Sequence, residues 1–355
     1  MDGYGRKAMP IRCRSPLRLG LAGGGTDVSP YCDLFGGAVL NATIDRYTHC
    51  TIEPREDGKI YIRAADLGLH ELMDATPTLE EIGPLQLHKC VYNRIVREYN
   101  GGKPISFALT TWSDAPPGSG LGSSSTLVVS MVGAFAEWLH LPMGEYDIAR
   151  CAFVVERVDL GLAGGKQDQY AAAFGGVNLI EFYAGDRVIV NPLRVKDWIL
   201  NELEASLVLY FTGVSRDSAR IIDEQIRNTR NKSEASVEAM HALKADVGRM
   251  KEAILFGDIQ QFARILDSSW QAKKRMAQGI SNDHIERIRQ VALAAGAIAG
   301  KVTGAGGGGY MMFVVPPLQR LSLVDALSRL GGEVMNFHFT KEGVTAWRTG
   351  NGNID

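Results

Sequence analysis

The sequence of 355 residues contains few cysteines, and their arrangement argues against a fold that is built on them. The five cysteines are scattered between Cys13 and Cys151, odd in number and without a C-x-x-C pair. A disulfide framework needs paired cysteines, and a structural zinc site needs ligands at short, regular spacings. We therefore expect reduced thiols and a cytoplasmic protein.

A surplus of charge and a long apolar run are also missing. Asp and Glu number 40 and Lys and Arg 38, so the net charge is −2, whereas a nucleic-acid binder would show a basic surplus. The most apolar stretch, Leu127–Leu139, is interrupted by Ser130 and Glu137 and is too short to span a bilayer. Residues 1–10 lack the apolar centre of a signal peptide and are expected to form a disordered tail. Neither nucleic acid nor a membrane is predicted as a partner.

Strand-like and helical segments alternate without a strict strand–helix–strand rhythm, which predicts an α+β fold. In the first part we expect strands at 11–21, 38–53, 105–112 and 177–182, and helices at 87–99, 123–140, 146–158 and 167–174. In the second part we expect a strand at 205–212, helices from 218 to 295 with a break near Gly257, and a closing strand pair at 310–315 and 344–348 around a helix at 321–330. The predicted domains are therefore 11–203 and 204–348.

Glycine is the abundant residue, and two of its three clusters fail the common phosphate-binding patterns. The segment Gly161–Gln167 comes nearest to a Walker A loop, but its glycine spacing is one short and glutamine stands where a hydroxyl belongs. The string Gly304–Gly309 fits the dinucleotide pattern, but a strand-like segment follows it instead of a helix. A nicotinamide-dependent oxidoreductase is therefore disfavoured.

The remaining cluster, Pro116–Ser125, reads P-P-G-S-G-L-G-S-S-S and leads into a helix. Alternate glycines allow the main-chain N–H groups to turn inward as an anion-binding nest. Hydroxyl residues at and after the helix N-cap add free N–H groups and the positive end of the helix dipole. The loop has no lysine, so a metal and backbone donors must compensate the phosphate charge. The predicted ATP-binding residues are Pro117, Gly118, Ser119, Gly120, Leu121, Gly122, Ser123, Ser124 and Ser125.

Three motifs in this order resemble those of the GHMP kinases (galactokinase, homoserine kinase, mevalonate kinase and phosphomevalonate kinase). The phosphate loop resembles the second motif, Ser15–Asp27 resembles the N-terminal substrate motif, and Lys301–Gly309 resembles the C-terminal glycine motif. The resemblance spans residues 11–348. It implies the two-domain GHMP-kinase fold, with an N-terminal domain like ribosomal protein S5 and a C-terminal ferredoxin-like α/β sandwich.

The resemblance also implies roles for single residues in an ATP-dependent phosphoryl transfer. Asp168 matches the catalytic aspartate, which removes the acceptor's proton or orients its hydroxyl, and Arg18 matches the arginine beside it. Ser124 and Glu156 match the serine and the carboxylate that hold Mg²⁺. From spacing alone, Glu156 would be a glutamate on a helix surface and Asp168 a helix N-cap.

The acceptor motif departs from galactokinase, which has a glutamate and a histidine where this chain has Gly24 and Gly25. The segments GGGTD and KQDQYAAAFGG are similar to the family branch that acts on L-fucose and on a heptose 7-phosphate. This likeness implies a sugar phosphate that is phosphorylated at its anomeric hydroxyl. The predicted substrate-binding residues are Gly24, Gly25, Thr26, Asp27, Lys166, Gly306 and Gly307, with Lys166 as the first candidate for the sugar's phosphate and Arg46 and Arg216 as weaker ones.

Other interpretations stay open. A kinase of L-fucose, another sugar or an isoprenoid-type alcohol would keep the reaction and change the acceptor. A catalytically silent sensor of sugar and ATP would be expected to lack the base or the metal ligand, and the presence of Asp168 and Glu156 disfavours it. The sequence leaves the oligomeric state open, a homodimer included.

Overall fold

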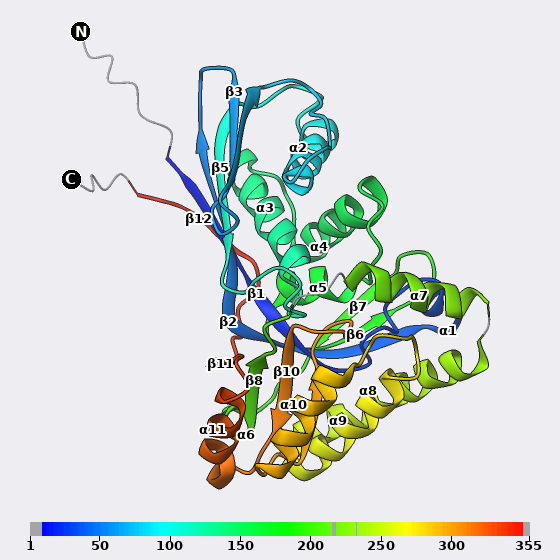
Figure 1. The fold of residues 1–355 in the computed structure, drawn as a ribbon. Helices are drawn as coiled ribbons and strands as arrows, with labels where there is room; N and C mark the ends of the chain where they lie inside the picture. The colour runs from blue at the N-terminus through cyan, green and yellow to red at the C-terminus, as the bar shows by residue number, and fades with distance from the viewer. Residues whose placement is uncertain (1–8, 215–217, 232, 351–355) are drawn as a thin grey trace.

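The computed structural model describes residues 9–214, 218–231 and 233–350, which fold into two sheets with helices packed against them (Figure 1). Residues 1–8 of the predicted tail lie outside these ranges. The mixture of antiparallel and parallel pairing with segregated helices confirms the predicted α+β class. None of the helices in the described part of the chain combines the length and apolar character that a membrane crossing needs.

The first sheet forms the body of the N-terminal unit. Its main path runs β12-β1-β2-β5-β3-β4, and β6 and β7 extend it from β2. The strands are β1 (Ile11–Ala22), β2 (Gly37–Pro54), β3 (Lys59–Ala64), β4 (Leu69–Asp74), β5 (Phe107–Ser113), β6 (Val177–Phe182), β7 (Val188–Pro192) and β12 (Thr345–Arg348).

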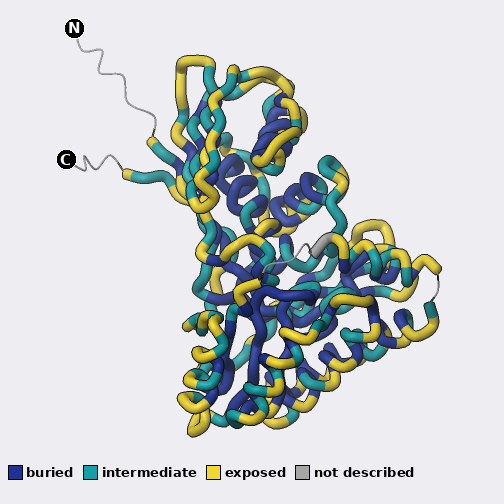
Figure 2. Tube along the Cα trace, viewed as in Figure 1, coloured by how far each residue is buried: buried dark blue, intermediate teal, exposed yellow. Residues whose placement is uncertain are grey.

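One face of this sheet is covered by helices, and α3 (Ser123–Leu139) is the innermost of them (Figure 1). Its residues from Val128 to Ala136 are all buried, because α3 lies between the sheet and the neighbouring helices (Figure 2). Those neighbours are α2 (Gln86–Tyr99), α4 (Glu145–Val154) and α5 (Gln167–Phe174). The small helix α1 (Tyr31–Phe35) follows the first glycine cluster.

The second unit has the sheet order β11-β8-β10-β9. Its strands are β8 (Leu207–Phe211), β9 (Ala299–Val302), β10 (Tyr310–Val314) and β11 (Glu333–Met335). Its helices are α6 (Asp197–Ser206), α7 (Ser218–Arg230), α8 (Glu234–Phe256), α9 (Ile259–Lys273), α10 (Asp283–Ala294) and α11 (Arg320–Ser328). The predicted break near Gly257 is where α8 ends and α9 begins.

The prediction that the last two strands pair with each other is wrong. β10 pairs with β8 and β9, whereas β12 returns to the first sheet and pairs with β1. Both segments alternate like strands, but their partners lie far away in the sequence, and local pattern does not identify such partners. The boundary proposed at 203/204 falls within α6.

The two units share a core, and the candidate site lies between them. One buried cluster includes Leu19 of β1 and Leu40 of β2 together with Leu209 of β8 and Met312 of β10. Continuous apolar packing across the two sheets fixes how their loops face each other. The three glycine clusters meet where those loops converge.

Candidate active site

A cavity of about 540 Å³ lies where the three glycine clusters converge. Gly24, Gly120 and Gly304 each come from a different cluster and line it together. The phosphate loop contributes Pro117, Gly118, Gly120, Gly122, Ser123, Ser124 and Ser125 to the lining. Two predicted residues of that loop, Ser119 and Leu121, are buried and do not line the cavity.

The phosphate loop uses its glycines to reach a backbone geometry that other residues avoid. Gly118, Gly120 and Gly122 have φ values of 72°, 80° and 80°. We expected a hydroxyl residue at the N-cap of α3, and this prediction is wrong. The N-cap is Gly122, and Ser123–Ser125 form the first turn. The N–H groups of that turn have no acceptor within the helix, so they are available to an anion.

The C-terminal cluster braces the phosphate loop. The N–H of Tyr310 donates to the carbonyl of Ser119 at 2.8 Å. A Cβ on Gly120 would stand 2.7 Å from the carbonyl oxygen of Thr303, and one on Gly309 would stand 2.4 Å from that of Ser119. The two segments therefore approach closely only because these positions are glycines.

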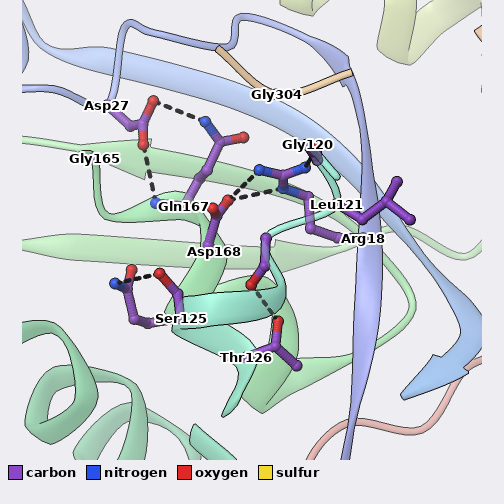
Figure 3. A network of polar contacts seen from close by, with 12 residues as sticks. Arg18, Asp27, Gly120, Leu121, Ser125, Thr126, Gly165, Gln167, Asp168 and Gly304 are labelled. Carbon is purple, nitrogen blue, oxygen red and sulfur yellow. Dashed lines mark hydrogen bonds and ion pairs between the residues drawn. The ribbon is translucent and has the colours of Figure 1, made fainter. Parts of the chain in front are cut away.

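Arg18 of β1 binds Asp168 of α5 near the N-terminus of α3 (Figure 3). Its Nε lies 2.8 Å and its Nη2 2.6 Å from the same atom, Asp168 Oδ1. Its Nη1 donates to the carbonyl of Gly120 at 2.6 Å, which ties the pair to the phosphate loop. Asp168 is the second residue of α5 and Lys166 is the N-cap, so the alternative role of Asp168 as N-cap is wrong.

The other oxygen of Asp168 faces the start of α3. A Cβ on Gly122 would stand 3.2 Å from Asp168 Oδ2, whereas the hydrogen bond and the ion pair of Arg18 go to Oδ1. The side chain of Asp168 is 22% exposed, whereas that of Arg18 is 5% exposed. One carboxylate oxygen is thus fixed and the other is open to the cavity.

Glu156 lies in a π-helical turn, Val155–Asp159, that follows α4. The alternative of a surface glutamate is wrong, because Glu156 is buried and lines the cavity. Its Oε1 accepts a 3.4 Å hydrogen bond from Ser124 Oγ, and its Oε2 accepts one from Gln169 Nε2 at 2.5 Å. A hydroxyl and a carboxylate oxygen this close form a donor set that suits Mg²⁺.

Asp27 lines the cavity, but its oxygens are engaged by the protein (Figure 3). They accept hydrogen bonds from Gln167 N at 3.0 Å, Gln167 Nε2 at 3.0 Å and Gly25 N at 3.2 Å. Burial raises the pKa of its carboxyl, and the bond from Gln167 N opposes that shift. Asp27 therefore joins the first glycine cluster to the start of α5, a packing role that the sequence analysis did not expect.

Other predicted acceptor residues are not brought into the cavity. Lys166 Nζ forms a 2.7 Å ion pair with Asp186 and lies 5.3 Å from the centre of the Phe153 ring. Thr26, Gly306 and Gly307 are buried and absent from the lining, whereas Gly24 and Gly25 line it. Arg46 Nη2 donates to the carbonyl of Asn336, and Arg216 lies outside the described residues.

The structure adds two lysines to the cavity that sequence reasoning missed. Lys273 ends α9 and Lys301 lies in β9, and both line the cavity. Lys301 opens the third motif, which was a usable signal. The sequence gave no such signal for Lys273, because a single lysine in a helix is usually solvated.

Comparisons with known proteins agree with this arrangement. The family model for the N-terminal domain of GHMP kinases matches residues 86–176, and the model for their C-terminal domain matches residues 241–332. D-glycero-alpha-D-manno-heptose 7-phosphate kinase of Campylobacter jejuni is 52% identical over 338 residues, which cover 95% of this chain and 99% of that protein.

Two further relatives differ in how much of their length is matched. L-fucokinase/L-fucose-1-P guanylyltransferase of Bacteroides fragilis is 28% identical, over 85% of this chain and 34% of that protein. A crystal structure described as a D-glycero-D-manno-heptose 1-phosphate kinase from Bacteroides thetaiotaomicron has a TM-score of 0.82 and 48% identity, over 96% of this chain and 100% of that one. The predicted fold and resemblance are confirmed, and this chain belongs to the GHMP kinases, which are phosphotransferases with an alcohol group as acceptor.

Proposed function

We propose that this chain transfers the γ-phosphoryl group of ATP to the anomeric hydroxyl of D-glycero-D-manno-heptose 7-phosphate. The product would be the 1,7-bisphosphate, in the biosynthesis of nucleotide-activated heptose in the cytoplasm. The 52% identity to a heptose 7-phosphate kinase over nearly the whole chain supports the choice of acceptor. The observation that carries the reaction type is the Arg18–Asp168 pair beside the lysine-free phosphate loop.

The donor half of the reaction depends on positioning. The N–H groups at the start of α3 and the nest formed by Gly118, Gly120 and Gly122 would cradle the phosphates of ATP. Because the C-terminal glycine cluster braces this loop, its donors are oriented before the nucleotide arrives. Preoriented donors stabilise charge that develops in the transition state without further reorganisation.

The acceptor half depends on Asp168. Its Oδ1 is held by Arg18, so Oδ2 is the oxygen that can accept the proton of the anomeric hydroxyl. Oδ2 faces Gly122, the N-cap of α3. This position would place the anomeric hydroxyl next to the γ-phosphate of ATP. The anomeric hydroxyl is the most acidic on a sugar, so a carboxylate is a sufficient base.

Ser124 and Glu156 would hold Mg²⁺, through Ser124 Oγ and the carboxylate oxygen beside it. A bound Mg²⁺ would supply positive charge against the phosphates of ATP. Gln169 Nε2 fixes the other oxygen of Glu156, so the carboxylate keeps its orientation toward the cavity.

The direct test is release of ADP from Mg-ATP with a panel of acceptors. The panel contains D-glycero-D-manno-heptose 7-phosphate, the unphosphorylated heptose, heptose 1-phosphate, L-fucose and mevalonate. We expect the highest kcat/KM with the 7-phosphate, and a product whose new phosphate is on the anomeric carbon by NMR. A higher kcat/KM with L-fucose would favour the alternative function, a sugar kinase of the L-fucose type. Background hydrolysis with every acceptor would contradict the sugar-kinase proposal.

A further inference from the structure

We propose that Lys273 and Lys301 bind the phosphate group that the acceptor sugar already carries. The two lysines belong to the second unit and line the same cavity as Asp168. This inference rests on the proposed function, since it concerns how that site recognises a phosphorylated sugar. The two lysines replace Lys166 as the candidates for this phosphate, because the ammonium group of Lys166 is paired with Asp186.

The two ammonium groups are held by main-chain carbonyls of the C-terminal and the N-terminal motifs. Lys273 Nζ donates to the carbonyl of Gly304, and Lys301 Nζ donates to the carbonyl of Leu21 at 3.0 Å. Lys273 Nζ also lies 3.8 Å from the position that a Cβ on Gly24 would occupy. Each ammonium has three N–H donors and uses one of them for its carbonyl, so further donors remain for a ligand.

Neither lysine has a carboxylate partner of its own. Across residues 9–214, 218–231 and 233–350, no Asp or Glu oxygen lies within 4.0 Å of Lys273 Nζ or Lys301 Nζ. The nearby carboxylates are already engaged: Asp168 by Arg18, Asp27 by Gln167, and Asp246 by Arg249 and Ser269. Buried cations are normally paired, so two unpaired ammonium groups on one cavity wall indicate that an anion completes the site.

The titration of the two lysines fits a site that binds an anion. Burial, followed by the nearby charge of Arg18, lowers the pKa of Lys273 to about 8. Burial, followed by the charges of Lys273 and Arg18, lowers the pKa of Lys301 to about 7. A phosphate dianion between them would favour the protonated forms and raise both pKa values.

The acceptor's phosphate fits this position better than the phosphates of ATP do. The nucleotide has its own set of donors on the first unit, where Arg157 Nη2 also lies 3.3 Å from Ser125 Oγ at the start of α3. Lys273 Nζ lies instead beside Gly24 and Lys301 Nζ donates to Leu21, and both of these residues belong to the segment that resembles the family's substrate motif. One cavity would thus receive two phosphorylated ligands through two separate sets of donors.

The test compares Lys273→Met and Lys301→Met with the control Lys274→Met. Methionine keeps an unbranched apolar chain and removes the charge, and Lys274 is paired with Glu286 at 3.2 Å and does not line the cavity. Binding of heptose 7-phosphate and of unphosphorylated heptose is measured by titration calorimetry, and kcat and KM are measured for both acceptors and for ATP.

We expect each lysine variant to weaken binding of the 7-phosphate by about a hundredfold, which is typical when one partner of a buried charge pair is removed. Binding of the unphosphorylated heptose and the KM for ATP should stay within about twofold of wild type, as should every parameter of Lys274→Met. Equal losses with both sugars, or a loss of ATP affinity, would overturn the inference.

The same measurements separate this inference from the proposed function. If wild type prefers another phosphorylated sugar and the lysine variants lose that preference, the substrate assignment fails and the lysine site stands. If wild type prefers an unphosphorylated acceptor, the lysine site falls as well.

A second measurement uses the wild-type protein alone. It tests the inference even if Lys301→Met does not fold. At pH 8, binding of the 7-phosphate should take up protons, because the lysines gain protons when the dianion binds. Calorimetry in buffers with different ionisation enthalpies measures this uptake, and the unphosphorylated heptose should show none. Equal proton uptake with both sugars, or no uptake with the 7-phosphate, would also overturn the inference.

Discussion

On the proposals above, the two walls of the cavity would bind phosphate by different means. The wall formed by Gly118–Ser125 contributes no lysine or arginine and presents N–H groups at the start of α3. The wall formed by the second unit presents the side chains of Lys273 and Lys301. Main-chain donors depend on the backbone conformation, whereas ammonium groups depend on charge and pH. The first wall should therefore be sensitive to shape and the second to protonation.

Asp168→Asn should have the largest effect, because Asp168 lies between the two walls and belongs to neither. The amide cannot accept the proton of the hydroxyl, so kcat should fall by about 10²- to 10⁴-fold. Both walls stay intact, so the Kd for ATP measured by calorimetry should change little.

The control is Asp186→Asn, which removes a carboxylate that pairs with Lys166 away from the cavity. It should retain wild-type turnover. Near-normal turnover of Asp168→Asn would contradict the base assignment, and loss of ATP binding would show that Asp168 supports the glycine wall instead.

Gly122→Ala tests the shape of the glycine wall. Alanine at φ 80° is strained, and its Cβ would lie 3.1 Å from Asp168 Cγ. The strain should lower the free energy of unfolding by about 1–2 kcal/mol. Displacement of the carboxylate should lower kcat by about ten- to a hundredfold.

The matched control is Gly58→Ala, since Gly58 has φ 70° with open space around its Cβ position. It should show the loss in unfolding free energy, measured by denaturant titration, without a loss in kcat. Equal kcat values for both variants would mean that the contact with Asp168 is unimportant.

A smaller effect, on stability, should expose the pH sensitivity of the lysine wall. The pKa of Lys273 is lowered to about 8 in the folded chain, so the unfolded chain binds more protons between pH 8 and the ordinary lysine pKa. The free energy of unfolding should therefore rise with pH across that window in the protein without ligand.

Subtracting the stability of Lys273→Met isolates this contribution, because the variant lacks the titrating group. The difference between wild type and variant should grow in favour of wild type from pH 8 to pH 10. A flat difference, measured by urea titration at each pH, would show that Lys273 titrates normally and would weaken the contrast between the walls.

The contrast between the walls also explains what could be predicted from the sequence. The glycine wall was located because only glycine allows φ near 80° at Gly120 and Gly122, so its composition is visible in a short segment. The α+β class and helices such as Gln167–Phe174 followed from local pattern for the same reason. The return of β12 to β1 joins residues more than 300 positions apart, and no local pattern encodes it.

The lysine wall was missed because its members owe their position to tertiary packing. Lys273 ends a helix whose sequence does not differ from that of a solvated one, whereas Lys301 opens the C-terminal glycine motif but lies in a strand that gave no sign of facing the cavity. Asp27 was expected to bind sugar because its motif is typical of an acceptor loop. Its bonds to Gln167 depend on α5, which lies about 140 positions further along the chain.

Lys166→Met should give the smallest effect, and it tests where sequence proximity misleads. Lys166 is two positions before Asp168, yet its side chain points to Asp186 and the Phe153 ring. Methionine would keep the apolar contact with Phe153 and remove an ion pair whose carboxylate is 63% exposed. Solvent at Asp186 weakens the pair, and methionine also removes the cost of burying the charge of Lys166, whose side chain is 4% exposed, so the melting temperature should change little and the KM for the phosphorylated sugar should stay within about twofold of wild type. A large rise in that KM alone would place the acceptor's phosphate at Lys166 and would remove the reason for assigning it to the second unit.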